Sequence, residues 1–412
     1  MDLIRTGLQN LDDARANLDR LKADGVSDER LVGMLKALSK ACDPDCALSN
    51  FVDITNAMQS QGRDFDAMVP DEAALERLIT VLGVSDEMGK LMRFRPELVE
   101  AAANDACESH LYNHEQRRAH VLKSVGADPN DHTMPTASLP LAEAATALRK
   151  TYRKQLAAIM AQDATANDPI EIQPRISTEL SDLADAALEG ALAIARHEVD
   201  GSEHVRFAII GMGKLGAQEL NYVSDVDLIY VVEPADMDTN GMTLSRIGTK
   251  MATTLQRVCQ SVIMGVAEPT LWQIDGGLRP EGKDGPLVRR LESHEAYYEQ
   301  WAENWEFQAL LKARPVAGDT DLGQAYMDMT RPFVWTASKR DNFVYDCQQM
   351  RKRVEDLIPN PLKDREIKLG RGGLRDVEFT VQMLQLVHGR SDEALRTSST
   401  LESLQALAEG GY

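Results

Sequence analysis

The sequence predicts a predominantly helical α+β protein in which a short set of strands separates two helical regions. Three observations support this. Aromatic residues make up only 5% of the chain while Ala, Leu and Glu are abundant, a composition that favours helices. Apolar residues follow helical spacing over the first 200 positions. Near residue 203 that spacing gives way to short apolar runs ended by glycine. With 412 residues, 43% of them hydrophobic, we expect two or three domains.

Residues 1–202 are expected to form a helical N-terminal domain. The segments 128–140 and 164–174, rich in residues that favour turns, predict loops. A helix is predicted to begin after Ser177 or Thr178 as its cap. The apolar positions that define the earlier helices are Leu11, Leu18, Leu21, Leu31, Met34, Leu35, Leu38, Leu75, Leu78, Ile79 and Leu82.

Residues 203–292 are expected to form the catalytic core and 293–412 a helical bundle. The core contains four predicted strands and one long helix, and the bundle three helices. The strands are expected at 205–210, 226–232, 270–275 and 286–288, and the helices at 244–264, 294–311, 342–357 and 376–388. The chain stops directly after a helical pattern and two glycines, so we expect it to be part of a longer protein.

The formal net charge of −20 argues against general binding to nucleic acid or to anionic membranes, which need a basic surface. The five cysteines stand at irregular spacings, and their odd number and spacing argue against a disulfide framework. The first residues lack the basic head and apolar core of a signal peptide, so we expect none. No uncharged apolar run in the sequence is long enough to predict a membrane-spanning helix. We therefore expect a soluble, cytoplasmic protein with no nucleic-acid or membrane partner.

The stretch 209–233 supports two interpretations. Gly211, Gly213 and Gly216 spell G-x-G-x-x-G after an apolar run, and Glu233 ends the next one, a pattern typical of dinucleotide binding. That fold, however, needs a full helix between the two strands. Only residues 217–223 separate the glycines from the next segment, which is short of the ten or so residues that a crossover helix requires.

The second interpretation is a metal site. Alternation along a strand places Asp225 and Asp227 on one face, where two like charges repel unless a cation lies between them. Oxygen ligands favour Mg²⁺, with Mn²⁺ as the alternative. Asp275 ends a later strand and is followed by Arg279 and Lys283, an arrangement that suits two-metal phosphoryl transfer. The simpler alternative is that both aspartates are solvated at an exposed strand start.

Two glycine-rich segments are candidates for holding phosphate or nucleotide. In the first, Gly211 and Gly213 allow close approach of the backbone, with Lys214 and Ser224 nearby. The second precedes a helix and contains Lys368, Arg371, Gly372, Gly373 and Arg375. The alternative for the second segment is a helix-start turn with solvated arginines. Trp305 suits core packing at least as well as a role toward substrate.

Taken together, these motifs resemble the bifunctional glutamine synthetase adenylyltransferase/adenylyl-removing enzyme family. The strongest match is 211–229, GMGKLGAQELNYVSDVDLI. The segments 274–287, 297–315, 367–379 and, in the helical leader, 82–98 also agree. The resemblance covers most of the chain from about residue 80. It implies a DNA-polymerase-β-like nucleotidyltransferase domain with a small mixed sheet, flanked by helical bundles.

The resemblance also implies an activity. Such enzymes carry two similar halves, and this single motif set after a helical leader resembles the N-terminal half, which removes AMP from a tyrosine of glutamine synthetase by phosphorolysis. Asp225, Asp227 and Asp275 would hold Mg²⁺, with ATP or ADP and phosphate as ligands and the PII signal protein as regulator. The alternatives are ATP-dependent adenylylation of the same tyrosine, and a regulatory module without turnover that binds glutamine synthetase or PII. One departure is Gly277, where the family often has Arg.

Overall fold

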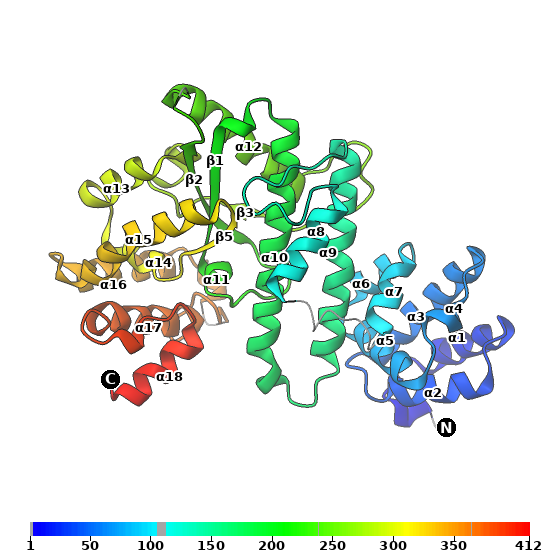
Figure 1. Cartoon of the computed structure of the whole chain (residues 1–412). Coiled ribbons are helices and arrows are strands. Elements are labelled where there is room, and N and C mark those ends of the chain that lie inside the picture. Colours follow the sequence, from blue (N-terminus) through cyan, green and yellow to red (C-terminus); the bar gives the residue numbers. More distant parts are fainter. Residues whose placement is uncertain (1–2, 105–112, 238, 364) are drawn as a thin grey trace. The chain divides into compact units, whose positions relative to one another are not determined.

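The structure is a computed structural model that describes residues 3–104, 113–237, 239–363 and 365–412. The chain forms two compact units, one made of residues 1–117 and 150–183, the other of 118–149 and 184–412 (Figure 1). The division into 1–202, 203–292 and 293–412 stays a prediction. Across the described residues, no helix has both the length and the apolar character that crossing a bilayer would need.

The first unit is a helical bundle around one apolar core. The predicted positions from Leu21 to Leu82 are buried in it, which confirms the helical spacing. Side-chain caps fix where helices begin: Ser27 accepts from Arg30 N, and Asp43 accepts from Cys46 N with Pro44 in the first turn. The elements are η1 (Leu3–Thr6), α1 (Leu11–Ala23), α2 (Asp28–Leu38), α3 (Pro44–Ser60), α4 (Phe65–Met68), α5 (Glu72–Val84), α6 (Asp86–Met92) and α7 (Pro96–Ala103).

Three further helices, α8 (His114–Ser124), α9 (Leu141–Ala164) and α10 (Pro169–Glu198), follow. The predicted loop at 128–140 is confirmed, but that at 164–174 is only partly right. Asp168 accepts hydrogen bonds from the N–H groups of Ile170 and Glu171, so α10 begins at Pro169 and continues through Pro174. The prediction of a cap at Ser177 or Thr178 is therefore wrong.

The second unit contains a mixed sheet, as predicted, with five strands in place of the four expected. Strands β1 (Val205–Met212) and β2 (Val226–Pro234) are antiparallel, and β5 (Arg314–Gly318) pairs antiparallel with the other edge of β1. The two-residue strands β3 (Ile274–Asp275) and β4 (Val288–Arg289) both pair in parallel with β2. β3 is shorter than the predicted 270–275. β5 was not predicted, because it is short and contains a proline, which only an edge strand tolerates.

Helices cover both faces of this sheet. α12 (Gly241–Gln260) packs against β1 and β2, and α15 (Thr320–Thr336) packs against β1, β2 and β5 (Figure 1). Ala208, Ile210, Met212, Ile229 and Val231 point toward the C-terminal helices and share one core with them. The remaining elements are η3 (Ser202–His204), α11 (Gly213–Gly216), η4 (Gly282–Asp284), α13 (Leu291–Gln300), α14 (Asn304–Leu310), η5 (Ala337–Lys339), α16 (Phe343–Asp356), η6 (Asn360–Leu362), α17 (Leu374–His388), η7 (Glu393–Leu395) and α18 (Thr400–Gly410).

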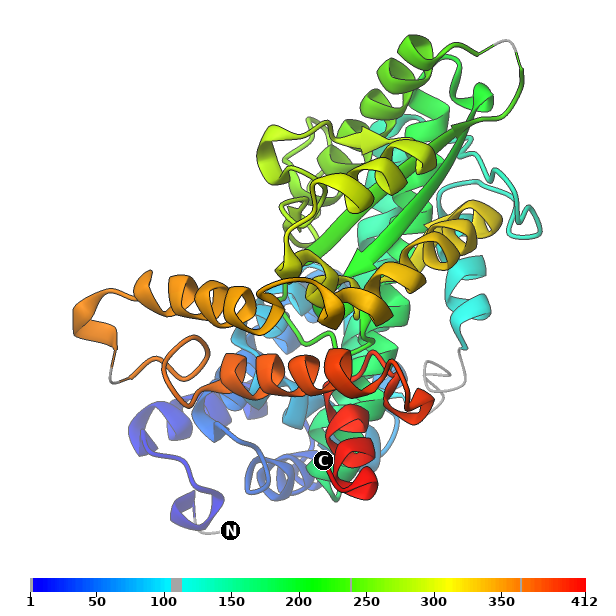
Figure 2. The same ribbon diagram turned by 90° about the vertical axis from the view of Figure 1, so that its left-hand side faces the viewer.

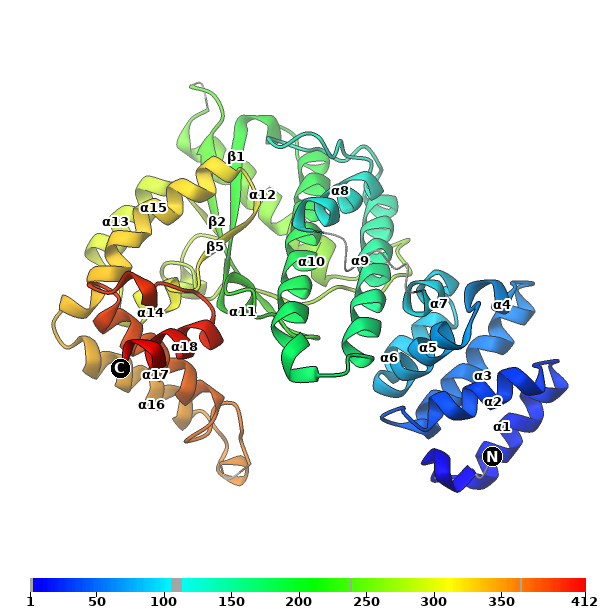
Figure 3. The same cartoon turned by 60° about the horizontal axis from the view of Figure 1, so that its bottom comes forward.

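The helix predicted at 294–311 is in fact two helices. Glu303 and Glu306 form a reciprocal capping box that starts α14, so the chain leaves α13 at Gln300 and begins a new helix at Asn304. α16 and α17 run side by side (Figure 2), and α17 also packs against α18 (Figure 3).

A substitution at Gly216 tests the packing of the glycine turn. A Cβ added there would lie 1.8 Å from the carbonyl oxygen of Lys312 and 2.4 Å from that of Gly211. Because neither backbone can yield easily, we expect Gly216→Ala to lower the free energy of unfolding by about 2–3 kcal/mol. Urea unfolding measures this. Gly241→Ala is the control, since a Cβ at Gly241 meets nothing within 4 Å; equal stability of the two variants would contradict the packing.

Candidate active site

Three aspartates gather at one end of the sheet. Asp227 on β2 stands directly opposite Asp275 on the parallel strand β3, and Asp225 immediately precedes β2. Since side chains alternate along a strand, Asp225 and Asp227 share the face of Ile229 and Val231. That is the face that the C-terminal helices cover. The site therefore lies at the border between the sheet and these helices.

The glycine turn places backbone against this group. Gly213 has φ +54°, and a Cβ there would come within 2.6 Å of a carboxylate oxygen of Asp227, so glycine alone suits the position. Gly211 lies in β1 opposite Leu228 and Arg314. The following helix, α11, has four residues, and β1 and β2 are antiparallel. A dinucleotide fold needs parallel strands joined by a full helix. The structure has neither at this position, which confirms that the G-x-G-x-x-G pattern is not a dinucleotide fingerprint.

Burial and neighbouring negative charges distinguish Asp227 from the other two carboxylates. Partial burial, followed by the negative charges of Asp275 and Asp225, raises the pKa of Asp227 to about 6, while Arg375 and Lys368 act in the opposite direction. A carboxyl group whose pKa is raised by burial and by like charges is typical of functional sites.

Lys368 and Arg375 lie close to Asp227, and both also lie close to Lys214. Burial, and then the charge of Lys368, lower the pKa of Lys214, whose Nζ lies 2.9 Å from Oδ1 of Asn221. The structure thus brings Lys368 and Arg375 close to Lys214 and Asp227, although they are about 150 positions away in sequence.

The loop that carries these cations is held in shape by Arg351. Its guanidinium donates to the carbonyls of Leu369 and Gly370 and pairs with Asp376, which also accepts from the N–H of Gly372 at 2.5 Å. Gly372 has φ +75° and Gly373 directly precedes α17. Arg371 is exposed near Asp376, so the structure does not bring it to the carboxylates.

Two predicted phosphate ligands point elsewhere. The guanidinium of Arg279 donates to the carbonyls of Gly276, Lys283 and Gly285 within its own loop, a geometry that favours a role in shaping the loop. Lys283 is exposed in η4.

Two other predicted or atypical positions lie near the carboxylates. Ser224 donates to the carbonyl of Asp225. Gly277, where the family often has Arg, donates its N–H to Asp275 at 2.7 Å, so the backbone at this position orients the third carboxylate.

A buried lysine that was not among the predicted site residues, Lys312, links three segments of the chain near the site. Lys312 Nζ lies 2.8 Å from Glu378, 3.1 Å from Glu219 and 3.0 Å from the hydroxyl of Thr400. Burial would raise the pKa of Glu378, but Lys312 and Arg375 more than reverse this and lower it. Burial of Lys312 depends on distant segments, so the sequence offered no local signal for it.

Some of the charged residues described above line a pocket of about 260 Å³. Asp227, Lys312, Arg375 and Glu378 form its charged part, and Trp305 and Phe379 are among its apolar walls. Mixed apolar walls with a few convergent polar groups are characteristic of small-molecule sites. Trp305 is thus half-buried at a pocket rather than enclosed in the core.

The donor chemistry of the three carboxylates fits a hard divalent cation. They offer only oxygen ligands, and their mutual repulsion is what a cation would relieve. In the described parts of the chain, no three His, Cys, Asp or Glu side chains already stand close enough to form a finished metal site. The fit therefore rests on charge and on ligand type.

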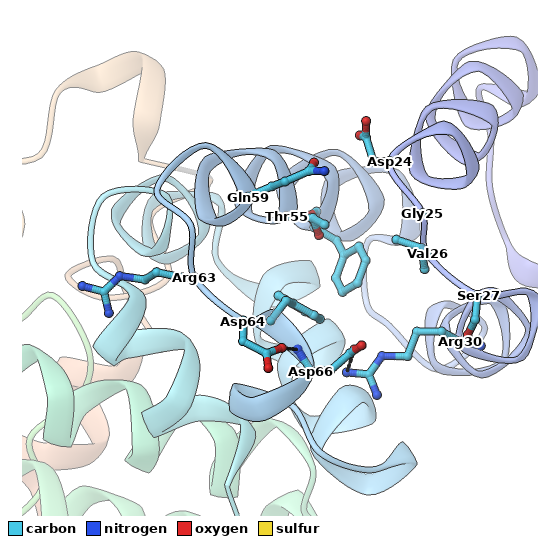
Figure 4. Close-up of a pocket in the computed structure, with 12 residues that line it drawn as sticks. Asp24, Gly25, Val26, Ser27, Arg30, Thr55, Gln59, Arg63, Asp64 and Asp66 are labelled. Carbon is cyan, nitrogen blue, oxygen red and sulfur yellow. Dashed lines mark hydrogen bonds and ion pairs between the residues drawn. The ribbon is translucent and has the colours of Figure 1, made fainter.

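A second pocket of about 260 Å³ lies in the first unit, between α3, α4 and the α1–α2 turn. Figure 4 shows Arg30 turned toward Asp66, at 3.5 Å, and Asp64 bound to the backbone at the start of α4. Arg30 also donates to the carbonyl of Val69 and stacks over Phe65. Much of the charge at this pocket is thus engaged in holding α4, and none of the predicted site residues belongs to it.

Comparisons with known proteins identify the family of this chain. A family model described as glutamate-ammonia ligase adenylyltransferase matches residues 75–329, and one described as GlnD PII-uridylyltransferase matches residues 348–412. The bifunctional glutamine synthetase adenylyltransferase/adenylyl-removing enzyme of Bifidobacterium longum (strain DJO10A) is 78% identical over 412 residues, which is 100% of this chain and 38% of the relative. The protein of that name from Cutibacterium acnes is 44% identical over 413 residues, 100% of this chain and 41% of the relative.

The fold and the arrangement of carboxylates at its sheet define a domain of the nucleotidyltransferase class. Within that class, the chain belongs to the glutamate-ammonia ligase adenylyltransferase family. It spans about two fifths of the length of the curated relatives that it matches, 38% of one and 41% of another.

The raised pKa of Asp227 has a measurable effect on stability. In the unfolded chain this carboxyl titrates near 3.8, and in the folded chain near 6. Its ionisation therefore costs the folded state nothing below pH 4 and up to about 3 kcal/mol above pH 6. We expect Asp227→Asn to gain stability relative to wild type as the pH rises from 4.5 to 7.5.

Urea unfolding in metal-free buffer at these two pH values measures the difference. Asp356→Asn, which removes an exposed carboxylate of the same unit, serves as the control and should track wild type. A difference between Asp227→Asn and wild type that stays constant with pH would show that the pKa is ordinary.

Proposed function

We propose that this chain removes AMP from adenylylated glutamine synthetase by phosphorolysis. The observation that carries the proposal is the group of Asp225, Asp227 and Asp275, with Lys368 and Arg375 close enough to act on Asp227. Asp227 and Arg375 also line one pocket. Carboxylates suited to a divalent cation beside a cationic cluster match the needs of phosphoryl transfer. The names of the relatives, which include an adenylyl-removing activity, indicate the substrate.

In this reaction an oxygen of inorganic phosphate attacks the α-phosphorus of the tyrosine–AMP ester. The bond from that phosphorus to the tyrosine oxygen breaks, the phenolate takes up a proton, and the products are ADP and unmodified glutamine synthetase. The phenol has a pKa near ~10, so its oxygen is a fair leaving group. Lys214, Lys368 and Arg375 would orient the phosphates and offset their charge, and Gly213 lets the backbone come close.

Asp225, Asp227 and Asp275 would hold Mg²⁺ or Mn²⁺. Such a cation supplies charge stabilisation for the transferring phosphoryl group and for the leaving oxygen. Asp227 in particular must be ionised to serve as a ligand, and its pKa of about 6 leaves it mostly ionised at neutral pH.

A second candidate is adenylylation of the same tyrosine with ATP. The relatives carry both activities in their name, and the same site can serve either direction. The match of residues 348–412 to a PII-uridylyltransferase model supports a PII-type protein as the regulator in both cases.

The defining experiment incubates the chain with adenylylated glutamine synthetase, phosphate and Mg²⁺ and measures ADP. Phosphate-dependent release of ADP supports removal. Incorporation of AMP from ATP supports the second candidate instead, and absence of both reactions would contradict an enzymatic role for this chain.

Two substitutions test the carboxylates. We expect Asp225→Asn and Asp227→Asn each to lower kcat by about a hundredfold or more, because the cation loses a charged ligand and no longer stabilises the transferring phosphoryl group as well. Asp356→Asn should keep normal turnover, and circular dichroism would verify that all three variants are folded. Near-normal turnover in either site variant would exclude its carboxylate from the reaction.

A further inference from the structure

A pair of buried glutamines lines the pocket beside Asp227. Gln308 on α14 and Gln382 on α17 are only 3% and 7% exposed, and Nε2 of Gln308 donates to Oε1 of Gln382 at 2.8 Å. Oε1 of Gln308 is buried with no hydrogen-bond partner. An unpaired buried amide oxygen is costly, and both glutamines border the pocket. Because the side chain borders the pocket, a small rotation of Gln308 would present this unused acceptor to a ligand.

The bond between the two amides determines what they can offer to that ligand. The bond uses one N–H of Gln308 and one lone pair of Gln382. Oε1 of Gln308 then remains as an acceptor and Nε2 of Gln382 as a donor, beside the second N–H of Gln308. The edge of adenine has the complementary pattern, since its exocyclic amine donates and its ring N1 accepts. Guanine has the reverse pattern at the same positions, a carbonyl that accepts and an N–H that donates.

We propose that Gln308 and Gln382 read the adenine base of the nucleotide, which makes them the residues that determine its specificity. The exocyclic amine donates to Oε1 of Gln308, and N1 accepts from Nε2 of Gln382. The proposal rests on the proposed function in one respect: the nucleotide is the one whose phosphate lies at the carboxylates.

The rest of the pocket suits this occupant. Trp305 and Phe379 contribute aromatic surface to the walls of the pocket. Any of the bases can stack on such rings, so stacking gives affinity without selecting the base. Arg375, whose guanidinium lies over the ring of Phe379 at 5.9 Å, borders the same pocket as Asp227. Base and phosphate contacts of one nucleotide are thus available around a single pocket, with the base identified by the two amides alone.

The test compares the binding of ADP and GDP to the 412-residue chain by titration calorimetry with Mg²⁺. Because a mismatched base leaves buried polar groups unpaired, we expect wild type to bind ADP about tenfold to a hundredfold more tightly than GDP. The double variant Gln308→Leu/Gln382→Leu removes both amides together, so neither is left unpaired, and its preference for ADP should fall to near unity.

Gln385→Leu is the matched control. Gln385 is a buried glutamine on the same helix, but its amide donates to the carbonyls of Leu395 and Thr397, and it does not border the pocket. Its loss can reduce stability, yet the ADP-to-GDP ratio should stay at the wild-type value. Equal binding of ADP and GDP by wild type, no binding of either, or an unchanged ratio in the double variant would each overturn the assignment.

These outcomes are separate from those of the turnover assay. Binding is measured without glutamine synthetase, so a clear preference for ADP in a chain that performs no phosphorolysis would uphold the base-reading pair and reject the proposed direction. Phosphorolysis by a chain that binds ADP and GDP equally would uphold the proposed function and reject the base-reading role of Gln308 and Gln382.

Discussion

The burial of Asp227 beside two further carboxylates, Asp275 and Asp225, is the constraint on which the candidate site depends. Register pairing of two parallel strands holds these carboxylates next to each other, and the backbone of Gly213 closes on one of them. The strand pairing fixes the backbone positions of both residues. The positive groups that lower the pKa of Asp227 come from a distant segment: Lys368 lies in the loop before α17, and Arg375 lies in the first turn of α17.

The buried ions in the C-terminal half depend on one another for the same reason. Lys312 would be unfavourable without Glu219 and Glu378, and Glu378 without Lys312 and Arg375. Removing Lys312 takes the ion-pair partner from Glu219, and removing Glu378 leaves Lys312 with Glu219 alone, so each loss weakens the compensation of a buried charge. The network thus joins the loop after the glycine turn, the end of α14 and the start of α17 into one arrangement, and Arg375 is held where it can influence Asp227.

Much of this could be predicted from the sequence, because the relevant signals are local. Apolar spacing predicted the N-terminal helices, and short apolar runs predicted β1 and β2. The pair Asp225 and Asp227 followed from strand alternation. β5 was missed because its identity as a strand comes from pairing with β1 about 100 residues earlier. Lys312 and the glutamine pair were missed because their burial depends on contacts between distant helices, which no local pattern records.

Arg279 illustrates the opposite error. Its position after a strand-end aspartate suggested a phosphate ligand, yet a turn of this length lets the guanidinium reach the carbonyls of its own loop. Backbone carbonyls left free by an irregular segment need donors, and an arginine nearby is the simplest supply. Chemistry inferred from residue type alone cannot choose between these uses.

The link from Glu219 to the start of α18 has a consequence for biosynthesis. Glu219 accepts the backbone N–H of Thr400, 181 residues further along the chain. A ribosome adds roughly 5–20 residues per second, so the loop after the glycine turn emerges many seconds before the residues that complete its contacts. During that interval the nascent chain carries Glu219 without these partners, and the pocket can take its final form only after α18 has been synthesised.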